Sequence, residues 1–226
     1  MIPKTIHYCW FGSNGSPKPA DVQKLIDSWR QVLPDYTFKE WNETNFDVTM
    51  CAYSAEAYAT RNYAHVSDVC RMHALLTEGG IYLDTDIELL KSFDPYLHHD
   101  SFLGLELGDN LGTGVIGAQP GQKWIASFMD YYRTHHFINA VGHEVRTPNP
   151  ILLTRRVLPP LPKEDWPTVY PFEVFCAKDY TTGEIRATSR TVAIHNFSAS
   201  WRRHKTIAER ARRLLRGLAV RYVRGK

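Results

Sequence analysis

Residues 64–91 read AHVSDVCRMHALLTEGGIYLDTDIELLK, and they carry the strongest structural pattern in the chain. Apolar residues recur in it at three- and four-residue spacing, which predicts an amphipathic helix over 66–78. The glycine pair at 79–80 supplies the backbone freedom that a helix end needs. Residues 81–83, Ile-Tyr-Leu, then predict a short buried strand, and the chain leaves that strand at two aspartates one residue apart.

These two aspartates, Asp84 and Asp86, are the candidate metal ligands. Side chains alternate along an extended chain, so both carboxylates are expected to point the same way. Two carboxylates held this close repel each other unless a positive charge lies between them, and a hard divalent cation with oxygen ligands meets that need. The alternative is a solvated turn. The position after a buried strand end, where open α/β sheets bind ligands, favours the metal site.

The pattern of Ser-Asp at 67–68, Arg71, Gly-Gly-Ile-Tyr and Asp-x-Asp resembles a known signature. It is the signature of DXD-containing sugar transferases of the GT-A fold, the group of capsular polysaccharide and mannosyl enzymes (glycosyltransferase family 32). It is also similar to the glucosyltransferase domain of the large clostridial toxins. The resemblance implies that Asp68 accepts a hydrogen bond from the donor sugar or ribose and that Arg71 donates to sugar hydroxyls. The ordinary alternative for this pair is a surface ion pair, worth under about 1 kcal/mol.

The chain ahead of the signature predicts the start of a parallel sheet. A strand over 4–10 is followed by a glycine- and proline-rich loop over 11–19, a helix over 21–32 and a strand over 36–41. Strand, helix and strand at this spacing indicate a right-handed βαβ unit. Together with the resemblance, this predicts an α/β fold: a single GT-A-type domain over residues 1–200, with a Rossmann-like mixed central sheet flanked by helices.

Later segments extend this prediction. The pattern indicates a helix over 52–61, strands over 101–107 and 115–118, a helix over 122–137, a proline-rich surface loop over 159–171 and a late strand over 171–177. Residues 147–154 resemble a TGP-x-x-L-T segment of the family, which opens a helix beside the donor, but Asn149 stands where glycine is usual.

The remaining site candidates come from the two ends of the domain. Trp10 follows the first strand, and in the resembling family the matching tryptophan stacks on the uracil of the donor; His7 in that strand is expected to be a buried structural histidine. Related enzymes place a residue of the 192–201 segment on the metal, here His195, and a Ser-Trp pair, here Ser200 and Trp201, near the diphosphate. A neutral imidazole suits Mn²⁺ better than Mg²⁺, so Mn²⁺ (or Mg²⁺) is the predicted cofactor. The alternative for His195 is a buried strand-end histidine.

Composition limits the other classes of function. The chain has 226 residues, and its four cysteines lack any paired spacing, which favours reduced thiols in the cytoplasm. No basic-then-apolar leader and no run of about 18 apolar residues is present in the sequence. Residues 202–226 carry +9, which with the total of +3 leaves −6 for the rest of the chain. A nucleic-acid-binding domain would carry its positive charge on the folded body, so no nucleic-acid partner is expected.

The segment 201–226 predicts a basic amphipathic helix, with apolar residues on one face and arginines over much of the rest. Such helices lie on anionic membranes, where each arginine contributes roughly 1 kcal/mol. The expected location is therefore cytoplasmic and peripheral, on the inner face of the cell membrane. The alternative is a helix packed on the body with its arginines in solvent.

These observations predict a metal-dependent glycosyltransferase. It moves a hexose from a nucleotide sugar, a UDP-sugar, to a hydroxyl of a glycan or lipid-linked acceptor in polysaccharide or glycolipid synthesis, and the resemblance implies retention of configuration. The candidate catalytic residues are Asp84, Asp86, Asp68 and Arg71; the donor-binding residues are Trp10, Asp68, Arg71, Asp84, Ser200 and Trp201; the metal ligands are Asp84, Asp86 and His195. A metal-dependent nucleotidyltransferase or phosphohydrolase, and a non-enzymatic membrane-associated ion-binding module, remain alternatives.

Overall fold

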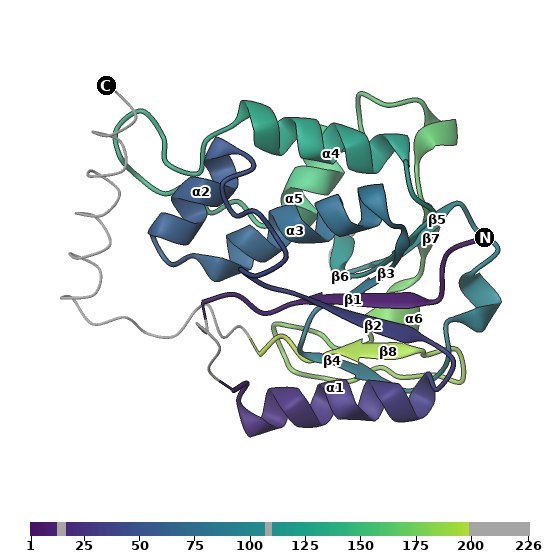
Figure 1. Ribbon diagram of the computed structural model, residues 1–226. Coiled ribbons are helices and arrows are strands. Elements are labelled where there is room, and N and C mark those ends of the chain that lie inside the picture. The colour runs from purple at the N-terminus through teal and green to yellow at the C-terminus, as the bar shows by residue number, and fades with distance from the viewer. Residues whose placement is uncertain (13–16, 107–109, 199–226) are drawn as a thin grey trace.

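The computed structural model describes residues 1–12, 17–106 and 110–198. A six-stranded sheet with the order β2-β1-β3-β6-β5-β7 forms its centre, beside a two-stranded sheet of β4 and β8 (Figure 1). The strands are β1 (Thr5–Cys9), β2 (Thr37–Trp41), β3 (Gly80–Leu83), β4 (Ile87–Leu89), β5 (Ser101–Leu105), β6 (Leu111–Ala118), β7 (Thr168–Tyr170) and β8 (Ala193–His195). The α-helices are α1 (Ala20–Val32), α2 (Ala52–Ala59), α3 (Tyr63–Thr77), α4 (Lys123–Thr134), α5 (Asn149–Leu152) and α6 (Phe172–Phe175).

Strand directions place three carboxyl ends at one edge of the central sheet. β1 runs parallel to β2 and to β3, which confirms the parallel pairing predicted for the first two strands. β6 is antiparallel to both β3 and β5, so β5 runs in the same direction as β1 and β3. The residues that follow β1, β3 and β5 therefore meet at a common edge, where α/β proteins place their ligands.

Helices cover both faces of the sheet. α2, α3, α4 and α5 lie over one face, whereas α1, α6 and the β4–β8 sheet lie over the other (Figure 1). Trp124, Phe128 and Met72 belong to the first of the two cores, and Trp29, Phe93 and Phe102 to the second. α3 lies between the sheet and its neighbouring helices α2 and α4, so most of its side chains are buried. It is more deeply buried than the amphipathic pattern over 66–78 suggests.

The structure corrects two predictions about the later part of the chain. Residues 172–175, expected as part of a late strand, form the short helix α6, because two phenylalanines and a valine satisfy the apolar requirement of either element. The segment 159–171, expected as a loop, contains the strand β7, which pairs with β5 in parallel. The predicted basic helix over 201–226 lies outside the described residues, and the division at residue 200 stays a prediction.

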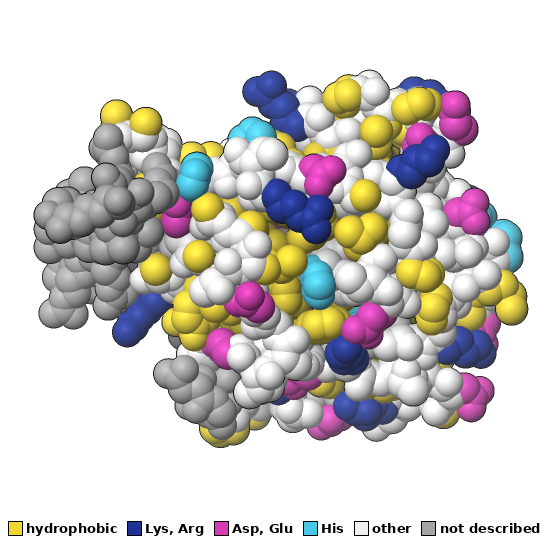
Figure 2. Space-filling model, turned by 45° about the horizontal axis from the view of Figure 1, so that its top comes forward, with side chains coloured by type: hydrophobic (Ala, Val, Ile, Leu, Met, Phe, Trp, Pro, Cys, Tyr) yellow, Lys and Arg dark blue, Asp and Glu magenta, His cyan; other side chains and the backbone are white. Residues whose placement is uncertain are grey.

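The surface over the helical layer mixes the two signs of charge. Figure 2 shows lysine and arginine side chains interspersed with aspartates and glutamates on this face, rather than gathered by sign. All four cysteines are free and buried. Within the described part of the chain, every helix is too short or too polar to span a bilayer.

Candidate functional site

The two aspartates after β3 lie in a tight turn, not in the extended chain that the sequence suggested. The backbone N–H of Asp84 donates to the carbonyl of Gly114 at 2.8 Å, and the N–H of Ile87 donates back to the carbonyl of Asp84 at 3.0 Å. The chain then enters β4, whose first residue, Ile87, is paired with His195 of β8. Pairing between distant strands, rather than period-two alternation, therefore brings both carboxylates to the imidazole.

Asp84, Asp86 and His195 form the candidate metal centre. One ligand atom from each lies within 4.8 Å of the other two. The Nε2 atom of His195 is 3.3 Å from Oδ1 of Asp86 and 3.9 Å from Oδ2 of Asp84. Burial lowers the pKa of His195, but its hydrogen bond to Asp86 and the charges of both carboxylates outweigh burial and raise that pKa to about 10. The carboxylates of Asp84 and Asp86 thus stabilise a positive charge at the imidazole of His195.

Asp86 is further fixed by Ser198, a residue that the sequence reasoning missed. Its Oδ2 atom accepts hydrogen bonds from the N–H of Ser198 at 2.8 Å and from the hydroxyl of that residue at 3.1 Å. Burial raises the pKa of Asp86, but hydrogen bonds and charge from His195, with the Ser198 bonds, lower it to about 2. Partners of this kind orient a ligating carboxylate and raise the affinity for metal.

Arg71 of α3 links Asp68 to the metal centre. Its Nη2 atom lies 2.9 Å from Oδ1 of Asp68 and 3.1 Å from Oδ1 of Asp84, and its Nη1 atom donates to the carbonyl of Thr113 at 2.6 Å. Only 5% of Arg71 and 9% of Asp68 are exposed, so this is not the surface ion pair of the alternative interpretation. Burial, opposed by Arg71 and reinforced by Asp84, raises the pKa of Asp68 to about 7.

The charges around this site favour a divalent cation. Arg71 contacts Asp68 and Asp84, and Asp86 adds a third carboxylate through His195. The site therefore has an excess of two negative charges when the three carboxyls are ionised and His195 has lost its proton. Two carboxylate oxygens and one imidazole nitrogen form a donor set that suits Mn²⁺. These residues therefore fit the predicted cofactor.

A glycine of β6 makes room for this centre. A Cβ atom at Gly114 would lie 3.0 Å from the ring of His195 and 3.1 Å from Oδ2 of Asp84. Glycine at this position therefore lets the candidate ligating side chains approach the backbone of β6 closely.

Two residues of the β1 segment take different positions. Trp10 is half-buried directly after β1, at the same sheet edge as Asp84. Its backbone N–H donates to the backbone carbonyl of Trp41 at 2.8 Å. His7 is fully buried. The Nε2 atom of His7 lies 2.8 Å from the carbonyl oxygen of Gly79, and its Nδ1 atom accepts a hydrogen bond from the indole N–H of Trp41 at 3.0 Å. His7 is thus the structural histidine that the sequence predicted.

The segment over 147–154 opens a short helix, α5, as predicted. Asn149 is its first residue, is buried, and accepts a hydrogen bond from the hydroxyl of Tyr132. Ser200 and Trp201, predicted near the diphosphate, lie outside the described residues.

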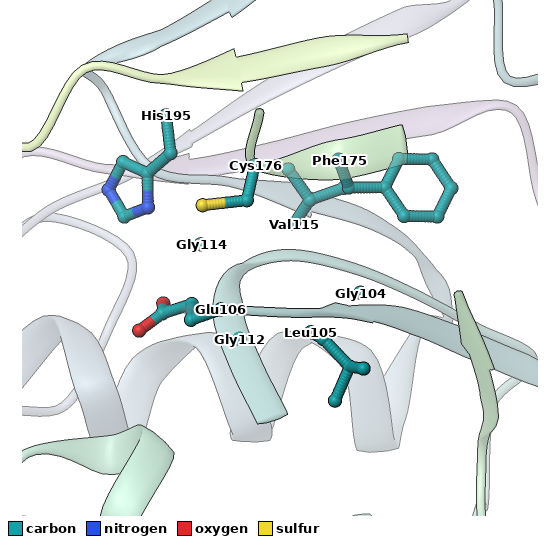
Figure 3. A pocket seen from close by; sticks show the side chains of 9 residues that line it. All are labelled: Gly104, Leu105, Glu106, Gly112, Gly114, Val115, Phe175, Cys176 and His195. Atoms are coloured by element: carbon teal, nitrogen blue, oxygen red, sulfur yellow. The ribbon is translucent and has the colours of Figure 1, made fainter. Parts of the chain in front are cut away.

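Glu106 is a second residue that the sequence reasoning did not single out. It follows β5 and faces a pocket beside the metal centre, lined by Gly104, Leu105, Glu106, Gly112, Gly114, Val115, Phe175, Cys176 and His195 (Figure 3). Burial raises the pKa of Glu106 to about 7; His195 and Arg71 oppose the shift, and Asp84 adds to it. A glutamate at a strand exit carries no sequence signal that separates it from a surface residue.

Comparison with known proteins agrees with this geometry. Over 96% of this chain and 98% of the other, the fold matches a solved glycosyltransferase involved in the glycosylation of the major capsid of PBCV-1, with a TM-score of 0.50 and 11% identity. The chain therefore has the fold of GT-A glycosyltransferases. Residues 19–103 match the family described as the glycosyltransferase sugar-binding region containing a DXD motif, and the DXD is Asp84-Thr85-Asp86.

Two curated relatives match parts of the chain. Inositol phosphoceramide mannosyltransferase 3 of Schizosaccharomyces pombe is 26% identical over 132 residues, which cover 55% of this chain and 35% of the relative. Glucan organizing enzyme 1 of Cryptococcus neoformans var. grubii is 34% identical over 82 residues, covering 30% of this chain and 22% of the relative. The chain thus spans about a third of the first relative and less of the second. The family match makes residues 19–103, with their DXD motif, similar to glycosyltransferases, and the mannosyltransferase relative agrees with this.

Proposed function

We propose that this chain is a metal-dependent glycosyltransferase that moves a hexose from a nucleotide sugar, a UDP-sugar, to a hydroxyl of a glycan or lipid-linked acceptor with retention of configuration. The observation that carries this proposal is the convergence of Asp84, Asp86 and His195 at the carboxyl edge of the sheet. The name of the fission-yeast relative, which specifies mannose transfer and a ceramide lipid, supports a hexose as the group transferred and a lipid among the acceptors.

The leaving group in this reaction is a nucleoside diphosphate, whose negative charge grows as the glycosidic bond breaks. Mn²⁺, or Mg²⁺, held by Asp84, Asp86 and His195 would act as a Lewis acid on that charge, an effect of several kcal/mol. Ser198 and the β4–β8 pairing keep the carboxylate of Asp86 and the imidazole in place before the donor arrives. Such preorganisation removes the cost of arranging charges during the reaction.

The other residues position the donor. Trp10, at the end of β1, offers an aromatic face for the base, and Asp68 offers an acceptor for a hydroxyl of the sugar or ribose. Arg71 holds Asp68 and Asp84 at a fixed separation because its Nη2 atom contacts both carboxylates. One guanidinium thus couples the sugar-orienting carboxylate to the candidate metal ligand.

A screen of UDP- and GDP-sugars for Mn²⁺-dependent consumption, with glycoside acceptors supplied, tests the proposal. We expect the protein to consume a UDP-sugar, to lose the activity in a chelator, and to lose at least about a hundredfold in the Asp86→Asn variant, because the ion supplies several kcal/mol. Glu88→Gln is the matched control, since Glu88 is an exposed carboxylate on β4 two residues further on. The proposal fails if no nucleotide sugar is consumed, or if only the nucleotidyl group is transferred.

The remaining parts of the proposal concern location. A basic amphipathic helix over 201–226 would attach the protein to anionic lipid on the cytoplasmic face of the cell membrane, beside lipid-linked acceptors. Residues 202–226 supply the charge of +9 for this attachment. Sedimentation with anionic vesicles, compared with neutral vesicles, tests it.

A further inference from the structure

We propose that Glu106 binds the acceptor: its carboxylate accepts a hydrogen bond from a hydroxyl of the incoming saccharide. This inference rests on the proposed function and names a subsite within it. Glu106 follows β5, whereas the DXD motif follows β3 and Trp10 follows β1.

The order of strands at the sheet edge gives the direction of the donor. β1, β3 and β5 end at this edge in that order, with β6 between β3 and β5. A nucleotide sugar is linear, from base through ribose and diphosphate to sugar. With the base at Trp10 and the diphosphate at Asp84, the sugar and the hydroxyl that attacks it lie further along the edge. Glu106 is on that side of the metal centre.

Two glycines of β6 fix the spacing between Glu106 and the metal centre. Gly112 and Gly114 are two residues apart on a strand, so they share a face and lie about 7 Å from each other. A Cβ atom at Gly112 would lie 3.1 Å from Cγ of Glu106, whereas one at Gly114 would meet His195 and Asp84. Glu106 does not join the group whose ligand atoms lie within 4.8 Å of one another. It is thus a neighbour of the metal ligands and not one of them.

The carboxylate of Glu106 is placed to receive a ligand. Within the described ranges no group donates a hydrogen bond to it, although its own backbone N–H donates to the carbonyl of Asn110 at 2.7 Å. Figure 3 shows the carboxylate on the His195 side of the pocket, with the apolar side chains of Leu105 and Phe175 on the other. Among the described residues, the buried side-chain atoms without a hydrogen-bond partner do not include the carboxylate oxygens of Glu106, so solvent reaches them. A sugar hydroxyl would replace water at this carboxylate while the apolar wall receives the C–H face of the ring.

The test separates transfer from hydrolysis. Donor consumption is measured in Mn²⁺ with the UDP-sugar that the wild type uses, first with water alone and then with a panel of methyl and octyl glycosides. In Glu106→Ala we expect hydrolysis and the KM for donor within about twofold of the wild type, while glycoside-dependent transfer falls at least about tenfold, as removal of a charge-assisted hydrogen bond predicts. Glu106→Gln keeps the shape and an acceptor oxygen, so its loss is smaller. Glu88→Gln is the control.

Each other outcome has a defined meaning. Equal loss of hydrolysis and transfer in Glu106→Ala and Glu106→Gln, with an unchanged melting temperature, overturns the acceptor role and assigns Glu106 to the donor. Unchanged transfer, or a panel in which no glycoside accelerates donor consumption by the wild type, also overturns it. A wild type that consumes no nucleotide sugar refutes the proposed function itself, before any variant is compared.

Discussion

Replacing Gly114 with alanine tests whether the geometry around the DXD turn determines metal affinity. The added Cβ would lie 3.0 Å from the ring of His195 and 3.1 Å from Oδ2 of Asp84, so these side chains must give way by a few tenths of an ångström. A shift of this size uses up most of the roughly 0.5 Å within which a metal site must hold its ligands. We therefore expect the dissociation constant for Mn²⁺ to rise about tenfold, which is about 1.4 kcal/mol, while the fold is kept.

The assay is isothermal titration of Mn²⁺ into the wild type, Gly114→Ala and Gly112→Ala. Gly112 is the matched control because it is on the same strand and face, but its added Cβ would meet Glu106 and the carbonyl of Gly104 and not the metal centre. Gly112→Ala should therefore bind Mn²⁺ within about twofold of the wild type. Equal affinity in Gly114→Ala and the wild type, or equal weakening in both variants at unchanged melting temperature, would refute the reasoning.

Three further predictions concern stability. Arg71→Met should lower the free energy of unfolding by about 3–5 kcal/mol, because two carboxylates lose their buried partner; a urea titration showing under about 1 kcal/mol would contradict this. Saturating Mn²⁺ should raise the melting temperature of the wild type but not of Asp86→Asn, and an equal rise in both would exclude Asp86 as a ligand. Burial lowers the pKa of His7 from 6.5, and its Nδ1 faces the indole N–H of Trp41. As the pH falls, the unfolded chain binds a proton at His7 before the folded chain does. The contribution of His7 to stability is therefore full above about pH 6.5 and is lost as the pH falls below it. The urea midpoint should fall less on acidification in His7→Gln than in the wild type.

The sequence was sufficient to predict the helices and strands that local residue patterns determine. The helix over 66–78, the strand at 81–83 and the parallel start of the sheet follow from apolar spacing and glycine positions, and the structure contains all three. Asp84 and Asp86 stood out because they follow a buried strand. His195 entered through the family resemblance, and the pairing of β4 with β8 then brings it to both aspartates.

What the sequence did not reveal depends on contacts between distant segments. The turn at residues 84–87 forms because β4 pairs with β8, which lies about a hundred residues later. Glu106 and Ser198 have no distinctive local sequence pattern. They became candidates only because the structure places Glu106 in the pocket with His195 and Ser198 against Asp86. The short helix α6 differs from the predicted strand because its three apolar residues, Phe172, Val174 and Phe175, fit either period.

The last strand, β8, belongs to the small sheet, whereas the six strands of the central sheet all lie within residues 5–170. A ribosome has therefore made the whole main sheet before it adds the imidazole at position 195. Newly made protein would complete the candidate metal centre only after β8 is synthesised, and a chain stopped in the segment after β7 would fold its main sheet yet lack a third ligand. An ion bound by Asp86 and His195 would close a loop of about 110 residues, and the entropic cost of such a closure grows only slowly with length.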